Sequence, residues 1–243
     1  MYSFLFDYGF PILISIFMLY TMKSLSLFLK KSTQFHTLAS KLFNNTFIID
    51  HYAYRSFNIN SIISKYSHYT IEQDQYHFQN NVYANWLSHP NKPSIFVSQY
   101  NGVETDNSLN IDPEKINYYI NTQTPMEYSF YKTLNAHNQY LTWTILFHDS
   151  INHIAFLVND IEKIRDMIDT DFPEYELTNP ENPIQISRDK NLLQFAIKAE
   201  TINYPFADGS HPVPFTFIEF IERKNGRIGF EGENASKIFD STK

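Results

Sequence analysis

The sequence is first informative for what it lacks. It contains no cysteine, which excludes disulfide scaffolds, thiolate metal sites and cysteine nucleophiles together. It also lacks an excess of basic charge, because 19 Lys and Arg stand against 26 Asp and Glu, for a net charge of −7. A nucleic-acid partner needs basic patches that neutralise phosphates, so none is expected. The absence of cysteine agrees with a reducing compartment, and we expect the cytoplasm.

A long hydrophobic run is also missing. The apolar stretch Gly9–Met22 has only 14 residues, whereas a membrane-spanning helix needs about 20. No positive charge precedes this stretch and Asp7 lies just upstream, which does not fit a secretory signal. The stretch packs on the domain, touches a membrane or is dispensable. We expect residues 1–22 to be an extension without a catalytic role, and we expect no stable membrane partner.

What the sequence does contain is a large apolar content and an internal repeat. Hydrophobic residues make up 43% and aromatic residues 17% of the chain, which excludes a disordered protein. Residues 48–66 match residues 150–168. In both, a strand-like run with one histidine leads through a helix-capping residue into a helix with apolar residues on one side. The match aligns His51 with His153.

The repeat predicts two β-α-β-β-β modules. Strand-like runs follow each helix: 68–78, 81–87 and 94–100 in the first half, and 183–187, 192–202 and 215–222 in the second. We expect an α+β fold in which the modules, about 47–110 and 150–243, form a curved, partly open β-barrel around a metal cavity. Between the modules, Asp112 and Pro113 predict the start of another helix. Because no long linker occurs, residues 23–243 are expected to form one domain.

The matched histidines are candidate metal ligands. Side chains two residues apart share one face of a strand, so His51 lies beside Ala53 and His153 beside Ala155, and the small alanines leave room for substrate. A single histidine in such a place is more often a core residue, but a matched pair favours a metal. Glu219 is the best third ligand, because a carboxylate between apolar residues in mid-strand must be paired or metal-bound. Two histidines and one carboxylate suit non-haem Fe(II).

Arg55 is a candidate anchor for an acidic substrate. It follows His51 by four residues on the same face, which puts their Cα atoms roughly 13 Å apart. A short dicarboxylic acid would fit between them, with a 2-oxo acid end on the metal and the distal carboxylate in a bidentate pair with the guanidinium. The alternative is a buried ion pair between Arg55 and Asp50 or another acid. Leu157 holds the equivalent position in the second module.

Four segments resemble one known family. They are DHYAYRSF (50–57), NHIAFLVNDIE (152–162), FIEFIER (217–223) and IGFEGENASKIFDST (228–242). Together they resemble the 2-oxoadipate dioxygenase/decarboxylase family, also called hydroxyglutarate synthase. That family is related to the vicinal oxygen chelate superfamily, whose β-α-β-β-β modules are similar to the repeat described above. The resemblance covers most of the chain after the N-terminal extension.

The resemblance implies a function and a site. His51, His153 and Glu219 would bind Fe(II), and Arg55 would bind a 2-oxo dicarboxylic acid that reacts with O₂. 2-Oxoadipate would give 2-hydroxyglutarate and CO₂, a step of lysine breakdown. Gln99 stands where the family leads us to expect an acidic residue. Pseudo-symmetry of the final strands makes Gln99 the nearest counterpart of Glu219. We expect Gln99 to line the substrate site as a neutral side chain.

Two alternatives stay open. The first is another metalloenzyme of that superfamily, an isomerase or a ring-cleaving dioxygenase, which would not need Arg55 facing the metal. The second is a metal-free small-molecule binding module, against which the apolar surroundings of Glu219 argue. The remaining histidines have no matched partner and are not expected to bind metal. The sequence carries no signal of oligomeric state.

Overall fold

The computed structural model describes residues 40–43, 48–78, 82–100, 112–199, 201–231 and 233–234, without the side chains of residues 73–78. Contacts divide the chain into Met1–Phe47 and Ile48–Lys243, and the second unit carries all that follows. The predicted N-terminal extension, residues 1–22, lies outside the described residues. In the described part, no helix is both long and apolar enough to cross a membrane.

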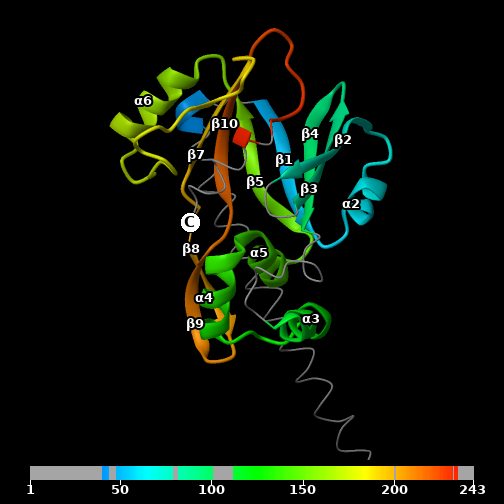
Figure 1. The fold of residues 1–243 in the computed structure, drawn as a ribbon. Helices are drawn as coiled ribbons and strands as arrows, with labels where there is room; N and C mark the ends of the chain where they lie inside the picture. Colours follow the sequence, from blue (N-terminus) through cyan, green and yellow to red (C-terminus); the bar gives the residue numbers. More distant parts are fainter. Residues whose placement is uncertain are drawn as a thin grey trace, which may run out of the picture. The chain divides into compact units, whose positions relative to one another are not determined.

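The main sheet is built from two modules of the same design (Figure 1). The first contains β1 (Ile48–Ser56), α2 (Ile59–Lys65), β2 (Thr70–Phe78), β3 (Val82–His89) and β4 (Lys92–Tyr100). The second contains β5 (Ser150–Leu157), α6 (Ile161–Asp171), β6 (Gln185–Ile186), β7 (Leu192–Ile197) and β10 (Phe217–Arg223). The strand order is β2-β3-β4-β1-β5-β10-β7-β6. Counted outward from the β1–β5 pair, the first module has the order β1-β4-β3-β2 and the second has β5-β10-β7-β6. In both, the last strand of the module pairs with its first strand, so the predicted pair of modules is confirmed.

The eight-stranded sheet has two ends. Its outer strands are β2 and β6, and no pairing among the described residues joins them. The mixed α+β class is therefore confirmed, whereas closure into a barrel is not. The antiparallel pair β1–β5 holds the two modules together at the centre of the sheet.

The two module helices begin where the sequence predicts. The Asn58 side chain accepts the backbone N–H of Asn60 at 3.1 Å at the start of α2. The Asp160 side chain accepts the N–H of Lys163 at 3.0 Å at the start of α6. Such caps satisfy N–H groups that have no partner within the helix. Both predicted caps are confirmed.

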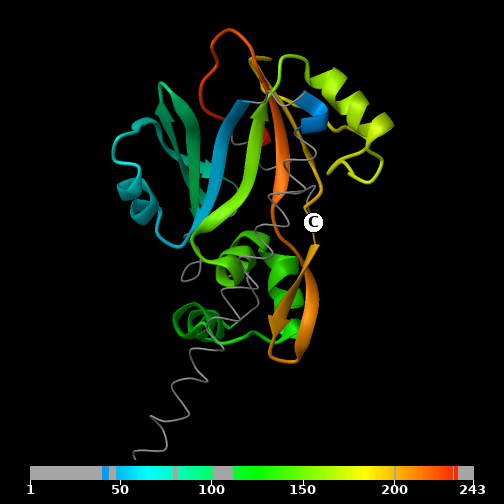
Figure 2. The same cartoon turned by 180° about the vertical axis from the view of Figure 1, so that it is seen from behind.

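The helices cover one side of the sheet, called here the helix face, and leave the other side, called the site face, to the functional residues. Ile62 of α2 packs on Leu87, Ile95 and Val97, and α6 packs on β10. On the site face of the first module, Ala53 packs with Ala84, Trp86, Phe96 and Phe230. Figure 2 shows α2 and α6 on the outside of the two halves of the sheet.

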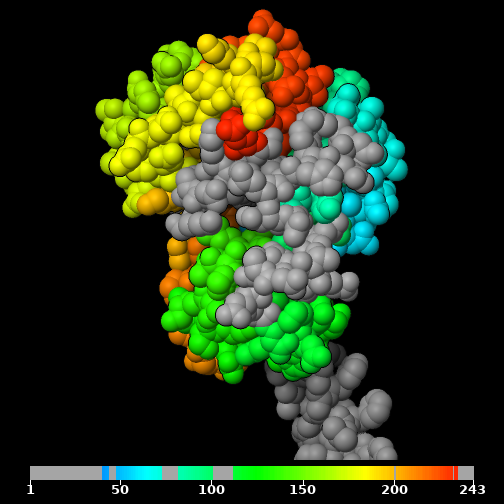
Figure 3. Space-filling view, viewed as in Figure 1, coloured from blue at the N-terminus to red at the C-terminus, as the bar shows by residue number. Residues whose placement is uncertain are grey.

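A helical layer lies at one end of the strands (Figures 1 and 3). It consists of α3 (Pro113–Thr122), α4 (Tyr128–His137) and α5 (Gln139–Phe147), with the hairpin β8 (Thr201–Phe206) and β9 (Gly209–Pro214). One apolar core joins them and includes Tyr131, Leu134, Leu141, Phe206 and Val213.

The sequence predicted this layer only in part. The Asp112 side chain accepts the N–H of Glu114 at 2.9 Å and begins α3, as expected. The prediction of one strand over residues 192–202 is wrong. β7 ends at Ile197, and β8 starts a separate hairpin that is inserted before β10.

Candidate metal centre

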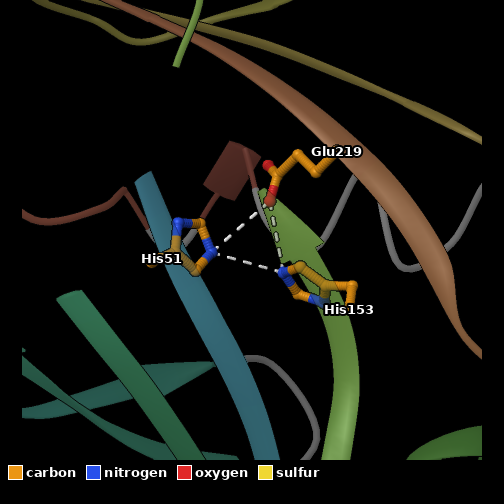
Figure 4. Close-up of side chains that lie close together, drawn as sticks. All are labelled: His51, His153 and Glu219. Carbon is orange, nitrogen blue, oxygen red and sulfur yellow. Dashed lines mark hydrogen bonds and ion pairs between the residues drawn. The ribbon is translucent and has the colours of Figure 1, made fainter. Parts of the chain in front are cut away.

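Three side chains from adjacent strands meet on the site face (Figure 4). His51 comes from β1, His153 from β5 and Glu219 from β10. His51 Nε2 lies 3.4 Å from His153 Nε2, and Glu219 Oε2 lies 3.6 Å from the first nitrogen and 3.2 Å from the second. All three residues are buried, with exposed fractions of 1%, 6% and 3%. The structure thus brings together the three ligands that the sequence predicted.

The spacing of these atoms fits a single metal ion. With metal–ligand bonds of about 2.1 Å, neighbouring donor atoms lie roughly 3.0 Å apart in octahedral and roughly 3.4 Å apart in tetrahedral coordination. The three ligand atoms of the cluster lie within 4.8 Å of one another. Imidazole nitrogen and carboxylate oxygen are donors that divalent transition metals accept. The cluster can therefore hold a metal ion.

Two β-bulges orient the imidazoles. The β1–β5 ladder skips Asp50 on one strand and Asn152 on the other, so both residues leave the regular alternation of side chains. Asp50 Oδ2 lies 2.8 Å from His51 Nδ1, and Asn152 Oδ1 lies 3.2 Å from His153 Nδ1. Each oxygen accepts a hydrogen bond from Nδ1, which leaves the Nε2 lone pair of each ring available to a metal ion.

Arg223 holds Asp50 in place. Its Nε and Nη2 donate to the two carboxylate oxygens at 2.7 and 2.9 Å, and its Nη1 donates to the carbonyl of Gly229 at 2.7 Å. Burial alone would raise the pKa of Asp50, but the hydrogen bonds from Arg223 and His51 outweigh burial and hold that pKa well below its ordinary value. Asp50 therefore remains a carboxylate. It pairs with Arg223, which removes it as the ion-pair partner considered for Arg55.

His153 is held in its neutral form. Burial lowers its pKa to about 4, although the neighbouring Glu219 carboxylate offsets part of this effect. A neutral imidazole is the form that binds a metal. Phe217 stacks on the ring with centroids 4.4 Å apart, so an aromatic wall covers one side of this ligand.

The two modules differ at the position of the carboxylate. Glu219 pairs with Ala155 in the β10–β5 ladder. In the first module the match of Ala155 is Ala53, and its partner on β4 is Phe96. The counterpart of Glu219 is therefore Phe96 and not Gln99, so only the second module supplies an acidic ligand.

Gln99 lies on the helix face. It pairs with Ser56, and its Oε1 accepts the N–H of Ile59 at 2.7 Å, at the start of α2. This bond ties the end of β4 to the helix. The position of Gln99 in the structure therefore does not support the prediction that it lines the substrate site.

The two alanines lie where the sequence placed them, on the site face. Ala53 stands directly opposite His153 in the β1–β5 ladder, and Ala155 stands opposite His51. They are 2% and 0% exposed. A methyl group at each place leaves room for the imidazole of the other module. Their contact with substrate stays a prediction.

Arg55 lines a pocket next to the cluster. Its walls include Trp143 of α5, together with Asn152 and Phe217, which contact His153. The guanidinium carbon lies 4.8 Å from the centroid of Tyr140 and 5.5 Å from that of Trp143. Burial lowers the pKa of Arg55 to about 10, so the side chain keeps its positive charge at neutral pH.

Sequence reasoning missed the residues that support the site. Tyr140 and Trp143, whose rings lie against the Arg55 guanidinium, come from α5, a helix that the sequence analysis did not identify. The sequence did contain a signal for the hydrogen bonds to the imidazoles, because a polar residue precedes each matched histidine: Asp50 precedes His51, and Asn152 precedes His153. Arg223 is separated from Asp50 by most of the chain, and no local pattern connects them.

Comparisons with known proteins bear on the family. Residues 114–227, which include His153 and Glu219 but not His51 or Arg55, match the family model described as 2-oxoadipate dioxygenase/decarboxylase. The chain is 28% identical over 138 residues to the chloroplastic 2-oxoadipate dioxygenase/decarboxylase of Arabidopsis thaliana, which covers 47% of this chain and 37% of that protein. Over this stretch the chain is similar to the 2-oxoadipate dioxygenase/decarboxylase family. The match spans less than half the length of the plant protein.

Solved structures of this family and of a wider group share the fold. Hydroxyglutarate synthase from Oryza sativa, solved in complex with 2-oxoadipate, has a TM-score of 0.77 at 22% identity, over 94% of this chain and 92% of that one. A protein described as belonging to the glyoxalase superfamily, from Ralstonia eutropha JMP134, has a TM-score of 0.63 at 14% identity, over 83% and 80% of the two chains. These likenesses extend the relationship in fold to nearly the whole chain.

We expect the cluster to bind one divalent metal ion. Replacement of His51, His153 or Glu219 by Ala removes one of three donors, so each variant should lose stoichiometric metal while its circular dichroism stays unchanged. Metal content is measured by mass spectrometry of the purified protein. His137→Ala, at an exposed position of α4, is the control and should keep its metal. Full metal content in two of the three cluster variants would contradict the assignment.

The two hydrogen bonds behind the imidazoles should differ in strength. Asp50→Ala removes a charged acceptor and leaves Arg223 without its carboxylate, so we expect metal affinity to fall about 10- to 100-fold. Asn152→Ala removes a longer, neutral hydrogen bond and should cost less. Competition with a fluorescent chelator measures both affinities. Equal affinities in the wild type and Asp50→Ala would show that the bulged carboxylate does not support the metal site.

Proposed function

We propose that this chain is a non-haem Fe(II) dioxygenase/decarboxylase that acts on a 2-oxo dicarboxylic acid and converts 2-oxoadipate and O₂ to 2-hydroxyglutarate and CO₂. The observation that carries this proposal is the combination of a two-histidine, one-glutamate cluster with a buried arginine in the adjoining pocket. The names of the plant relative and of the rice structure support the choice of substrate.

The donor set suits iron in particular. Two neutral imidazoles and one carboxylate are the protein ligands of many non-haem Fe(II) oxygenases, which leave further positions open. Bound Fe(II) would supply the activation of O₂ and the oxidative loss of CO₂. The protein's contribution is to keep a proton on Nδ1 of both rings, through Asp50 and Asn152, so that both Nε2 atoms face the ion. Burial of the cluster limits the access of water.

Arg55 is proposed to bind the distal carboxylate of the substrate. A guanidinium presents parallel N–H groups that match a carboxylate, and such charge-assisted pairs are stronger than neutral hydrogen bonds. The aromatic rings of Tyr140 and Trp143 lie against the guanidinium. They lower the local dielectric constant, which strengthens attraction between opposite charges. A substrate between Arg55 and the cluster would thus be held at both ends.

The alternative functions are weaker on structural grounds. A metal-free binding module does not explain why two imidazoles and a carboxylate converge in a buried place with both Nδ1 atoms already bonded. An isomerase or a ring-cleaving dioxygenase has no use for a buried arginine beside the cluster. Cytoplasmic localisation stays a prediction that rests on the absence of cysteine, and the plant relative is named chloroplastic.

Oxygen uptake with a panel of 2-oxo acids tests the proposed reaction. The reaction balances without a reductant, so the iron-loaded protein should consume O₂ and release CO₂ in equal amounts. Uptake should be fastest with 2-oxoadipate and slow with uncharged 2-oxo acids of similar length. The product is identified by mass spectrometry. Metal-loaded protein that consumes no O₂ with any 2-oxo acid would contradict the proposal.

Arg55 should set the preference for a second carboxylate. Arg55→Lys keeps the charge but loses the fork of N–H groups, so use of 2-oxoadipate should weaken while iron content stays the same. Arg55→Leu, which copies Leu157 of the other module, should lower kcat/KM for 2-oxoadipate about a hundredfold or more and shift preference to apolar 2-oxo acids.

The measurement is the ratio of kcat/KM for 2-oxoadipate and for an uncharged 2-oxo acid of similar length. Arg165→Leu on α6 is the matched control, because Arg165 does not line the pocket, and it should leave the ratio unchanged. If Arg55→Leu also leaves it unchanged, Arg55 is structural and the substrate class must be revised.

A further inference from the structure

Gln194 on β7 is a buried amide whose hydrogen-bonding groups are unused. Its side chain is 0% exposed, and neither Oε1 nor Nε2 has a hydrogen-bond partner in the structure. Buried polar atoms in native proteins nearly always have a partner, because an unpaired one destabilises the fold. An amide with two unpaired ends therefore points to a partner that the polypeptide itself does not provide.

The register of the sheet places Gln194 on the site face. Gln194 pairs with Ile221, and its neighbour Ala196 pairs with Glu219. Residues directly opposite one another in a ladder point to the same side, and diagonal neighbours lie roughly 7–8 Å apart, within reach of a long side chain. Gln194 is therefore a diagonal neighbour of the metal-binding Glu219. The surrounding wall is apolar, since Ile221 clusters with Ala155, Leu157 and Leu192.

Gln185 shows that the lack of partners is specific to Gln194. It is the direct cross-strand neighbour of Gln194 on β6, and it is also buried, at 7% exposure. Its Nε2 donates to the carbonyl of Asn182 at 2.8 Å. Gln185 on the edge strand β6 thus has a hydrogen-bond partner, whereas Gln194 on β7, the strand closer to the cluster, has none.

The chemistry of the missing partner follows from the other unpaired groups. Trp86 Nε1 and Asn234 Nδ2 are among the other buried donors that have no hydrogen-bond acceptor in the described structure. Trp86 packs against His51, with ring centroids 5.0 Å apart, and Figure 4 shows the short C-terminal helical segment (red) behind His51 and Glu219. Unused donors around a cluster with a single acidic side chain call for a ligand rich in acceptor oxygens, as a carboxylate is.

We propose that Gln194 binds the metal-chelating end of the ligand, with Nε2 donating to a carboxylate oxygen of a 2-oxo acid. This inference rests on the proposed metal site and adds a second recognition element to it. Along β1, Arg55 lies towards the end of the strand that pairs with Ser150, whereas Gln194 lies in the row of Ile221, on the other side of Glu219. Arg55 and Gln194 would thus recognise opposite ends of one ligand.

Oxalate is the probe for this role, because it chelates metals through carboxylate oxygens and has no distal carboxylate for Arg55. The full chain is loaded with Co²⁺ and titrated with oxalate by calorimetry under argon, so the readout does not depend on turnover. Gln194→Met keeps the shape of the side chain and removes its polar atoms. We expect this variant to bind oxalate about tenfold more weakly, with Co²⁺ content unchanged.

The same substitution should stabilise the ligand-free protein. Met fills the volume of Gln without an unpaired amide in an apolar wall, and a gain of this kind corresponds to a rise in Tm of about 2–4 °C for a chain of this size. Gln185→Met is the matched control. It loses the hydrogen bond to Asn182, so its Tm should fall while its affinity for oxalate stays that of the wild type.

The outcomes separate this inference from the proposed reaction. Oxalate binding that is absent in the wild type or unchanged in Gln194→Met overturns the role of Gln194, whatever the enzyme does with 2-oxoadipate. A fall in Tm in Gln194→Met shows that the amide has a structural partner and overturns it too. If oxalate binding weakens as expected but 2-oxoadipate is not turned over, the role of Gln194 stands and the proposed reaction fails.

Discussion

The antiparallel pairing of β1 with β5 is the constraint on which the site depends. It sets His51 opposite Ala155 and His153 opposite Ala53, so each imidazole faces a methyl group and both can reach the same point. The two bulges in this ladder turn the side chains of Asp50 and Asn152 so that each accepts a hydrogen bond from Nδ1 of the histidine that follows it. A shift of one residue in this pairing would turn the histidines to the helix face, because side chains alternate along a strand.

The repeat provides a symmetric frame, and the candidate site lies where the two modules depart from that symmetry. The frame supplies two histidines, each with a polar residue before it. Glu219 is matched by Phe96 in the other module, so the cluster has one carboxylate and keeps positions free for other ligands. Arg55 is matched by Leu157, so one end of the cavity carries charge. The hydrogen bonds to the two imidazoles also differ in strength, because Asp50 is charged and paired with Arg223, whereas Asn152 is neutral.

Local sequence signals predicted the modules, but not the layer that completes the pocket. The caps Asn58, Asp112 and Asp160 each predicted a helix, because their side chains bond the first free N–H groups. α5 is only nine residues long and is buried on all sides from Tyr140 to Leu146, so its sequence has no alternation of apolar and polar faces at helical spacing. The place of Gln99 depended on strand register, which tertiary pairing fixes and composition does not. Glu219 could be assigned because a carboxylate in the middle of an apolar strand must be paired or bound to a metal.

Both faces of the sheet contain buried aromatic residues, but the buried polar groups of the candidate site lie on the site face. The helix face carries fully buried aromatic residues, with Phe195 and Phe220 stacked at 5.0 Å, and such packing supplies most of the stability of a fold. The site face buries an arginine, two histidines and amides that apolar residues of similar size would replace without loss of packing. A buried polar group without a partner, such as the side-chain amide of Gln194, raises the free energy of the ligand-free protein. A ligand that bonds this amide in the folded state only would stabilise that state by mass action.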